Sequence, residues 1–142
     1  MRTVILVVSF VGMLILVGCL SRTAETMVLL DEKVSEVKIS KSNGFGGMNE
    51  DIMQSYTDAE SIKTFKNAIT TAQKQIGHVD VSDPEYDVMV EYTSAEEGQL
   101  PTHGIHLWLG KKNEKSMFMY IDDDEVYLTS VKNTQKLRLL IQ

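Results

Sequence analysis

The only cysteine, Cys19, ends an apolar run and decides how much of the chain is left to fold. The run follows a positively charged start and closes with Leu16-Val17-Gly18-Cys19. A positive start, a short apolar middle and a small residue before the cut are typical of a secretory signal peptide. We therefore predict a lipobox at Leu16, Val17 and Gly18, with cleavage before Cys19 and a diacylglyceryl group on its sulfur. The alternative is an uncleaved anchor helix, which needs ~20 apolar residues.

A lipidated Cys19 would fix the location of everything that follows it. Two acyl chains anchor a protein stably, whereas one chain binds a membrane only marginally. The sequence therefore predicts a protein of the cell membrane, held by membrane lipid on the extracytoplasmic face. We expect a signal peptide over residues 1–18, a lipidated N-terminus and tether over 19–32, and a folded domain over 33–142.

Removal of residues 1–18 leaves 124 of the 142 residues, enough for one domain with a sizeable core. No second cysteine is present, so disulfides and cysteine metal sites are excluded and packing must stabilise the fold. Without Arg2, 13 basic residues face 20 acidic ones, a net charge of −7. That balance disfavours nucleic acid as a partner, because binding it needs clustered Lys and Arg. We expect no cofactor.

The clearest helix pattern begins near Thr57. Thr57-Asp58-Ala59-Glu60 has the form of a capping box, in which side chains satisfy free backbone N–H groups. An apolar stripe at helical spacing follows and predicts one face packed on the core: Ile62, Phe65, Ile69, Ala72 and Ile76. Gly77 is expected to end the helix.

Alternating apolar and polar residues predict strands on both sides of this helix. The expected strands cover 33–41, 86–92, 105–109, 117–121 and 126–129. Ser130 can cap a C-terminal helix whose inward residues are Val131, Leu137, Leu140 and Ile141. The pattern predicts an α+β fold: a single small domain with an antiparallel sheet of about four or five strands, one long central helix and a C-terminal helix.

Five motifs spread over the mature chain resemble the YhfM-like domain of small lipoproteins from bacillus-type Gram-positive bacteria. They are Ser42-Asn43-Gly44-Phe45, the helix from Thr57 to Ala72, Pro84-Glu85-Tyr86-Asp87, His106-Leu107-Trp108-Leu109 and the ending from Lys136 to Ile141. The resemblance implies a surface lipoprotein. It implies no activity and brings no catalytic residues.

The polar motifs favour structural roles over metal binding. His103 and His106 are three residues apart, so a strand would point them to opposite faces, and His78 is distant in sequence. The acidic run 122–125 lacks the spacing of a calcium loop and is better explained as a solvated turn. The glycine-rich stretch 44–47 matches no phosphate-binding loop and predicts a turn. We therefore assign no metal site.

No nucleophile motif is present, so the sequence favours a protein that is not an enzyme. His106 and Trp108 lie opposite the aliphatic face of their strand, with Phe118 and Tyr120 expected beside them across a strand pair. An exposed aromatic patch of this kind usually marks a binding surface. The sequence predicts a non-catalytic domain that binds or senses an envelope protein or small ligand. The alternatives are a Trp108 packed beneath a loop and a metal-dependent or hydrolytic envelope enzyme that uses one of the three histidines.

Overall fold

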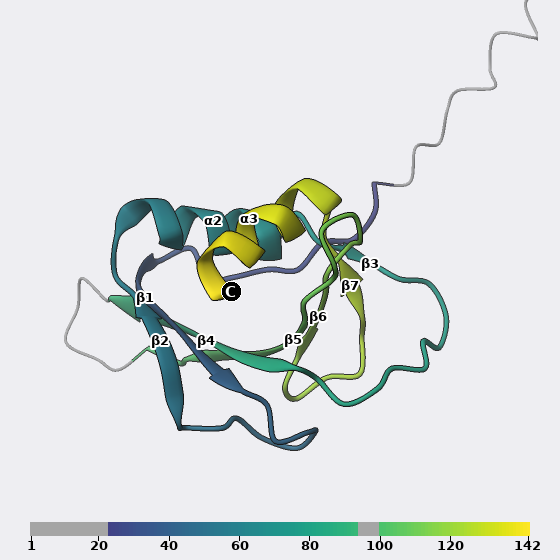
Figure 1. Ribbon diagram of the computed structural model, residues 1–142, viewed down its shortest axis with the longest axis horizontal. Helices are drawn as coiled ribbons and strands as arrows, with labels where there is room; N and C mark the ends of the chain where they lie inside the picture. The colour runs from purple at the N-terminus through teal and green to yellow at the C-terminus, as the bar shows by residue number, and fades with distance from the viewer. Residues whose placement is uncertain (1–22, 94–99) are drawn as a thin grey trace, which may run out of the picture.

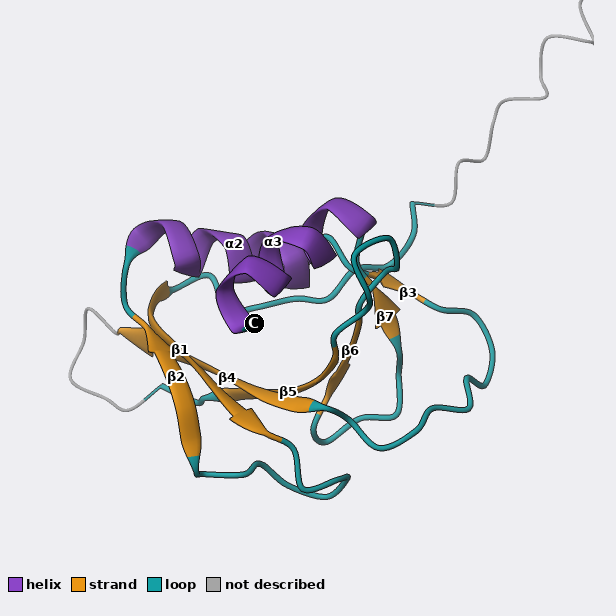
Figure 2. Cartoon of the chain, viewed as in Figure 1, coloured by secondary structure: helices purple, strands orange, loops and turns teal. Residues whose placement is uncertain are grey.

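The computed structural model describes residues 23–93 and 100–142, so the predicted signal peptide and lipobox lie outside the described residues. The chain is α+β, as predicted, with two helices packed over one face of an antiparallel sheet (Figure 1). The segment that joins the first two strands lies on the side of the sheet away from the helices (Figure 2). This second face is buried around His106 and Trp108, while Lys38 and Glu91 at the other end of it are partly exposed.

The sheet has seven strands in the described residues, where four or five were expected. Their order across the sheet is β2-β1-β4-β5-β6-β7-β3, and every neighbouring pair is antiparallel. The strands are β1 (Lys33–Lys41), β2 (Ile52–Tyr56), β3 (Gln73–Lys74), β4 (Tyr86–Thr93), β5 (His103–Trp108), β6 (Met117–Tyr120) and β7 (Tyr127–Leu128). The sequence missed β2 and β3. β2 is an edge strand whose Ile52 and Met53 are both exposed, and β3 is two residues long, so neither alternates.

Helix α2 (Ala59–Thr70) is shorter than predicted and begins with a different cap. Asp58, not Thr57, is the N-cap, and its carboxylate accepts a hydrogen bond from the backbone N–H of Ser61 at 2.8 Å. The backbone leaves the helix at Thr71 because the next residues pair with β7. Ile76 is consequently 98% exposed instead of lying in the core.

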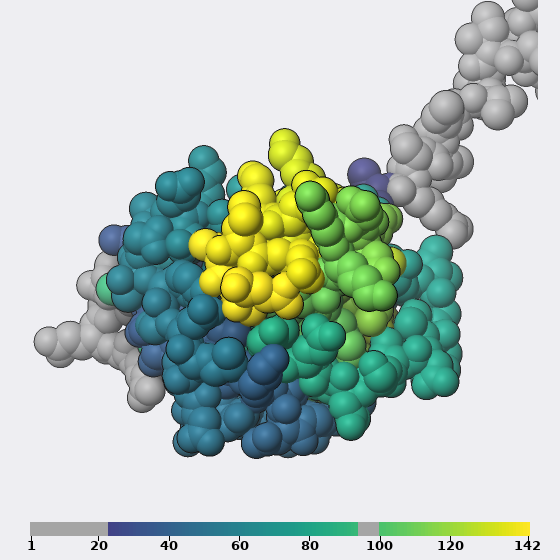
Figure 3. Space-filling view, viewed as in Figure 1, coloured from purple at the N-terminus to yellow at the C-terminus, as the bar shows by residue number. Residues whose placement is uncertain are grey.

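Helix α3 (Val131–Ile141) confirms the prediction at the C-terminus. Ser130 caps it by accepting a hydrogen bond from the backbone N–H of Asn133 at 3.1 Å. Leu137 and Ile141 are buried. In the space-filling view α3 lies across the centre of the helical face, where it covers the core (Figure 3).

The predicted tether is part of the domain over its second half. Met27 and Leu29 are buried in the main core. The Tyr120 hydroxyl donates to the carbonyl of Val28 at 2.6 Å and accepts from its N–H at 2.7 Å. Met27 and Leu29, which the sequence assigned to the tether, thus pack on the core together with residues 33–142. Among the helices of residues 23–93 and 100–142, none has the length and apolar character that crossing a bilayer requires.

Candidate functional site

The four residues predicted to form an aromatic surface do not form one. His106 and Trp108 are 1% and 7% exposed, and Phe118 is fully buried in the main core. The register between β5 and β6 pairs His106 with Met119 and Trp108 with Met117. Phe118 therefore lies on the opposite face of the sheet, with the half-buried Tyr120. The alternative, in which Trp108 packs beneath a loop, is confirmed.

Two loops cover the face of the sheet that carries His106 and Trp108. Phe45 lies in the segment between β1 and β2. Its ring packs edge-on against the His106 ring, with the ring centroids 5.7 Å apart, and its centroid lies 6.0 Å from that of the Trp108 ring. The indole N–H of Trp108 donates to the carbonyl of Ser82 at 2.8 Å. The predicted glycine turn lies in the first loop, where Gly44 and Gly46 have φ angles of 98° and 97° that disfavour any side chain.

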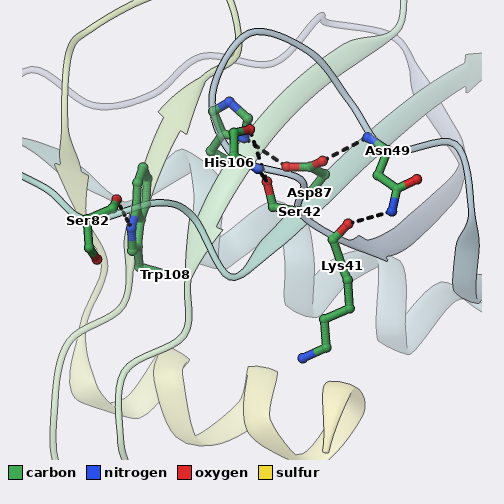
Figure 4. A network of polar contacts seen from close by, with 8 residues as sticks. Lys41, Ser42, Asn49, Ser82, Asp87, His106 and Trp108 are labelled. Carbon is green, nitrogen blue, oxygen red and sulfur yellow. Dashed lines mark hydrogen bonds and ion pairs between the residues drawn. The ribbon is translucent and has the colours of Figure 1, made fainter.

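Beneath Phe45, His106 forms a buried contact with Asp87. His106 Nδ1 lies 2.8 Å from Asp87 Oδ1, and both side chains are almost completely buried, with exposed fractions of 1% and 0%. β4 and β5 place the two residues directly opposite each other. The second carboxylate oxygen of Asp87 accepts from the backbone N–H of Asn49 at 2.9 Å, and Figure 4 shows the carboxylate between these two partners.

The other ring nitrogen, His106 Nε2, is buried and has no hydrogen-bond partner among the described residues. A buried polar atom without a partner costs free energy, so it needs an explanation. In the tautomer whose Nδ1–H donates to Asp87, Nε2 presents a lone pair. A carboxylate that orients an imidazole with a free Nε2 is the arrangement of a general base.

Ser40 completes the polar row on this face. It is fully buried, pairs in register with Asp87, and its hydroxyl has no partner among the described residues. Ser40 and His106 flank Asp87 on opposite sides, two strands apart, which is about 10 Å at the usual strand spacing. His106 therefore cannot take a proton from Ser40 directly.

The sequence identified His106 but missed Asp87. In the sequence Asp87 alternates with the apolar Tyr86 and Val88, and in the structure it faces away from the aliphatic core, beside His106. What the pattern could not reveal is that loops bury this second face. The Asp87–His106 contact also spans 19 residues, so it depends on a strand register that is not readable locally.

The remaining polar candidates lie apart from this site. His103 points to the other face from His106, as predicted, and its Nδ1 lies 2.6 Å from the Tyr92 hydroxyl. His78 is exposed. In the acidic turn, Asp123 accepts from the next two backbone N–H groups and Glu125 contacts Lys74 at 3.1 Å. Within the described ranges, no three His, Cys, Asp or Glu side chains are grouped to hold a metal ion.

Burial makes His103 a source of acid sensitivity. Desolvation lowers the pKa of His103 in the folded protein, because burial disfavours the charged imidazolium. The unfolded chain thus binds a proton at higher pH than the folded one does. The free energy of unfolding should therefore fall as pH drops through ~6.5, the ordinary histidine value. Melting temperatures measured across this range should fall less for His103→Asn than for the wild type. An equal fall in both proteins would contradict the assignment, and the exposed His78→Asn is the control.

A family model described as YhfM protein matches residues 31–142. The chain belongs to the YhfM family. This confirms the resemblance seen in the five sequence motifs. A search of curated proteins found no match for the YhfM-family chain.

A solved structure shares the fold of this YhfM-family domain. The crystal structure of a thioesterase-like protein from Clostridium sporogenes superposes with a TM-score of 0.62 at 16% sequence identity. The superposition covers 80% of this chain and 98% of the other. At this identity the likeness shows the common fold.

The likeness contradicts our prediction of a non-catalytic domain that binds or senses an envelope component. The predicted lipid anchor at Cys19 stays a prediction. The expectation that the chain is not an enzyme is unconfirmed, since the protein with the same fold is described as thioesterase-like. The aromatic surface on which the binding prediction depended is buried. The hydrolytic alternative is therefore the function to be tested at the His106–Asp87 site.

Proposed function

We propose that this YhfM-family domain hydrolyses carboxylic thioesters or esters, with His106 as the general base and Asp87 as the residue that orients it. The observation that carries the proposal is the buried, partnerless Nε2 of a histidine whose Nδ1 is held by a carboxylate at 2.8 Å. The thioesterase-like protein of the same fold supports the choice of substrate class.

The proposed step uses water as the nucleophile. Nε2 of neutral His106 takes a proton from the water as the water oxygen forms a bond to the acyl carbon. The C–S or C–O bond then breaks, and the imidazolium returns the proton to the departing thiolate or alkoxide. Asp87 remains ionised throughout and stabilises the imidazolium that forms between the two events. Ser40 takes no part as a nucleophile, because it lies on the far side of Asp87.

Substrate must displace Phe45 to reach Nε2. Phe45 is 51% exposed although its ring closes over His106, and glycines at 44, 46 and 47 surround it. Glycine lowers the cost of rearranging the backbone. Movement of this short segment, with β4 and β5 held in the sheet, would open the base to an acyl group without disturbing the core.

The predicted lipid anchor remains part of the proposal. Met27 is buried, and the eight Cα–Cα steps from Cys19 to Met27 span at most about 28 Å. Acylation of Cys19 would therefore hold the hydrolase close to the membrane, on its extracytoplasmic face, with membrane lipid as its partner. Cell fractionation of Cys19→Ala should release the protein from the membrane. Retention of the same lipid-modified, membrane-bound species would exclude the anchor.

The activity is tested on the chain from Leu20 onward, which contains every described helix and strand. Acyl thioesters of increasing chain length and matched oxygen esters are offered, and released thiol or alcohol is followed. Turnover above the background of a His106→Gln variant is expected for at least one series. If wild type and variant give the same rates on all substrates, the proposed hydrolase is wrong.

A further inference from the structure

A concavity lies on the helical side of the sheet, where α2 crosses the beginning of β1. It has a volume of about 570 Å³, within the range of small-molecule pockets. Val34 and Ile62 supply apolar lining, and Asn67 supplies an amide. His106 and Asp87 lie on the opposite face of the sheet, which separates the two sites.

Three lysines give this groove a charge opposite to that of the protein as a whole. Lys33 comes from β1, while Lys63 and Lys66 lie one turn apart on α2. Among the described residues that line it, none is acidic, although the chain carries 20 acidic and 14 basic residues. In the part of the chain that the structure describes, none of the three lysines forms an ion pair.

We propose that this groove binds an organic anion with a carboxylate or phosphate group at one end and a short apolar chain at the other. The ammonium groups of Lys63 and Lys66 would bind the anionic end, because charge-assisted hydrogen bonds are stronger than those between neutral groups. Val34 and Ile62 would contact the apolar chain and remove it from water. The groove is independent of the proposed hydrolysis, since no residue is shared between the two sites.

The test is a titration of the chain from Leu20 onward, labelled with ¹⁵N, with octyl phosphate and with octanoate below their micelle concentrations. Amide resonances of residues 33–35 and 62–67 should shift and saturate with either probe. Neutral octanol has the apolar chain without the anionic group, and inorganic phosphate has the anionic group without the chain. Both should bind at least about tenfold more weakly, equivalent to the loss of one group of contacts.

The lysines are tested with a double variant and a matched control. Lys63→Gln with Lys66→Gln should weaken octyl phosphate binding about tenfold or more, since two charge-assisted contacts are lost. Lys132→Gln with Lys136→Gln removes two exposed lysines from α3 and should leave binding unchanged. Equal weakening in both double variants would reveal nonspecific attraction and overturn the site. Absence of any shift in the groove resonances of the wild type would overturn it as well.

Discussion

Replacing His106 by Gln should lower kcat/KM for thioester hydrolysis by about 10²- to 10⁴-fold, the range that a positioned general base contributes. Glutamine has a similar reach and can still donate a hydrogen bond toward Asp87, which lies 2.8 Å from the histidine. It has no group that accepts a proton from water. The expected loss is therefore in kcat, and the substrate contacts that set KM remain.

A double-mutant cycle with Asp87→Asn separates this account from a purely structural role for the pair. If Asp87 acts through His106, the double variant should be little worse than His106→Gln alone, because residues that act as a unit are not additive. Circular dichroism and the melting temperature show whether each variant is folded. His78→Gln, at an exposed position, should keep wild-type rates. A folded His106→Gln protein with unchanged kcat would contradict the proposed role.

Replacing Phe118 by Ala should lower the free energy of unfolding by about 3–5 kcal/mol, the usual cost of removing a buried phenylalanine. Phe118 is fully buried in the main core, between the sheet and the helices. Urea denaturation measures the change, and Ile76→Ala is its control. Ile76 is 98% exposed, so its truncation should stay within about 0.5 kcal/mol. A change of less than about 1 kcal/mol for Phe118→Ala would contradict its burial and favour the exposed aromatic surface predicted from the sequence.

The helices were predictable where a local signal fixed them. Ser130 caps α3 through its own side chain, and that signal is complete within four residues. α2 was predicted in the right place but too long, since the apolar spacing continued through Ala72 to Ile76. Pairing of Gln73 and Lys74 with β7 ends the helical path there. That pairing joins residues more than 50 positions apart, so the local pattern could not reveal it.

The candidate site was only half predictable for a similar reason. His106 and Trp108 were correctly placed on the face opposite the aliphatic residues, but the sequence left open whether that face is a binding surface or lies beneath a loop. Phe45 covers His106, and the backbone of Ser82 binds Trp108. Loop paths of this kind leave no periodic trace in the sequence. The sequence around Asp87 does not distinguish it from a solvated strand residue. Only the register of β4 and β5 shows that it lies opposite His106.

The most direct test of the central claim is the reactivity of His106 toward diethyl pyrocarbonate, located by peptide mass spectrometry. The reagent acylates an imidazole nitrogen that has a free lone pair, and it requires no knowledge of the substrate. We predict modification of His106 more slowly than of the exposed His78, faster in Phe45→Gly, and in step with loss of hydrolysis. If His106 stays unmodified in both proteins while His78 reacts completely, Nε2 is not an accessible base and the proposed site is contradicted.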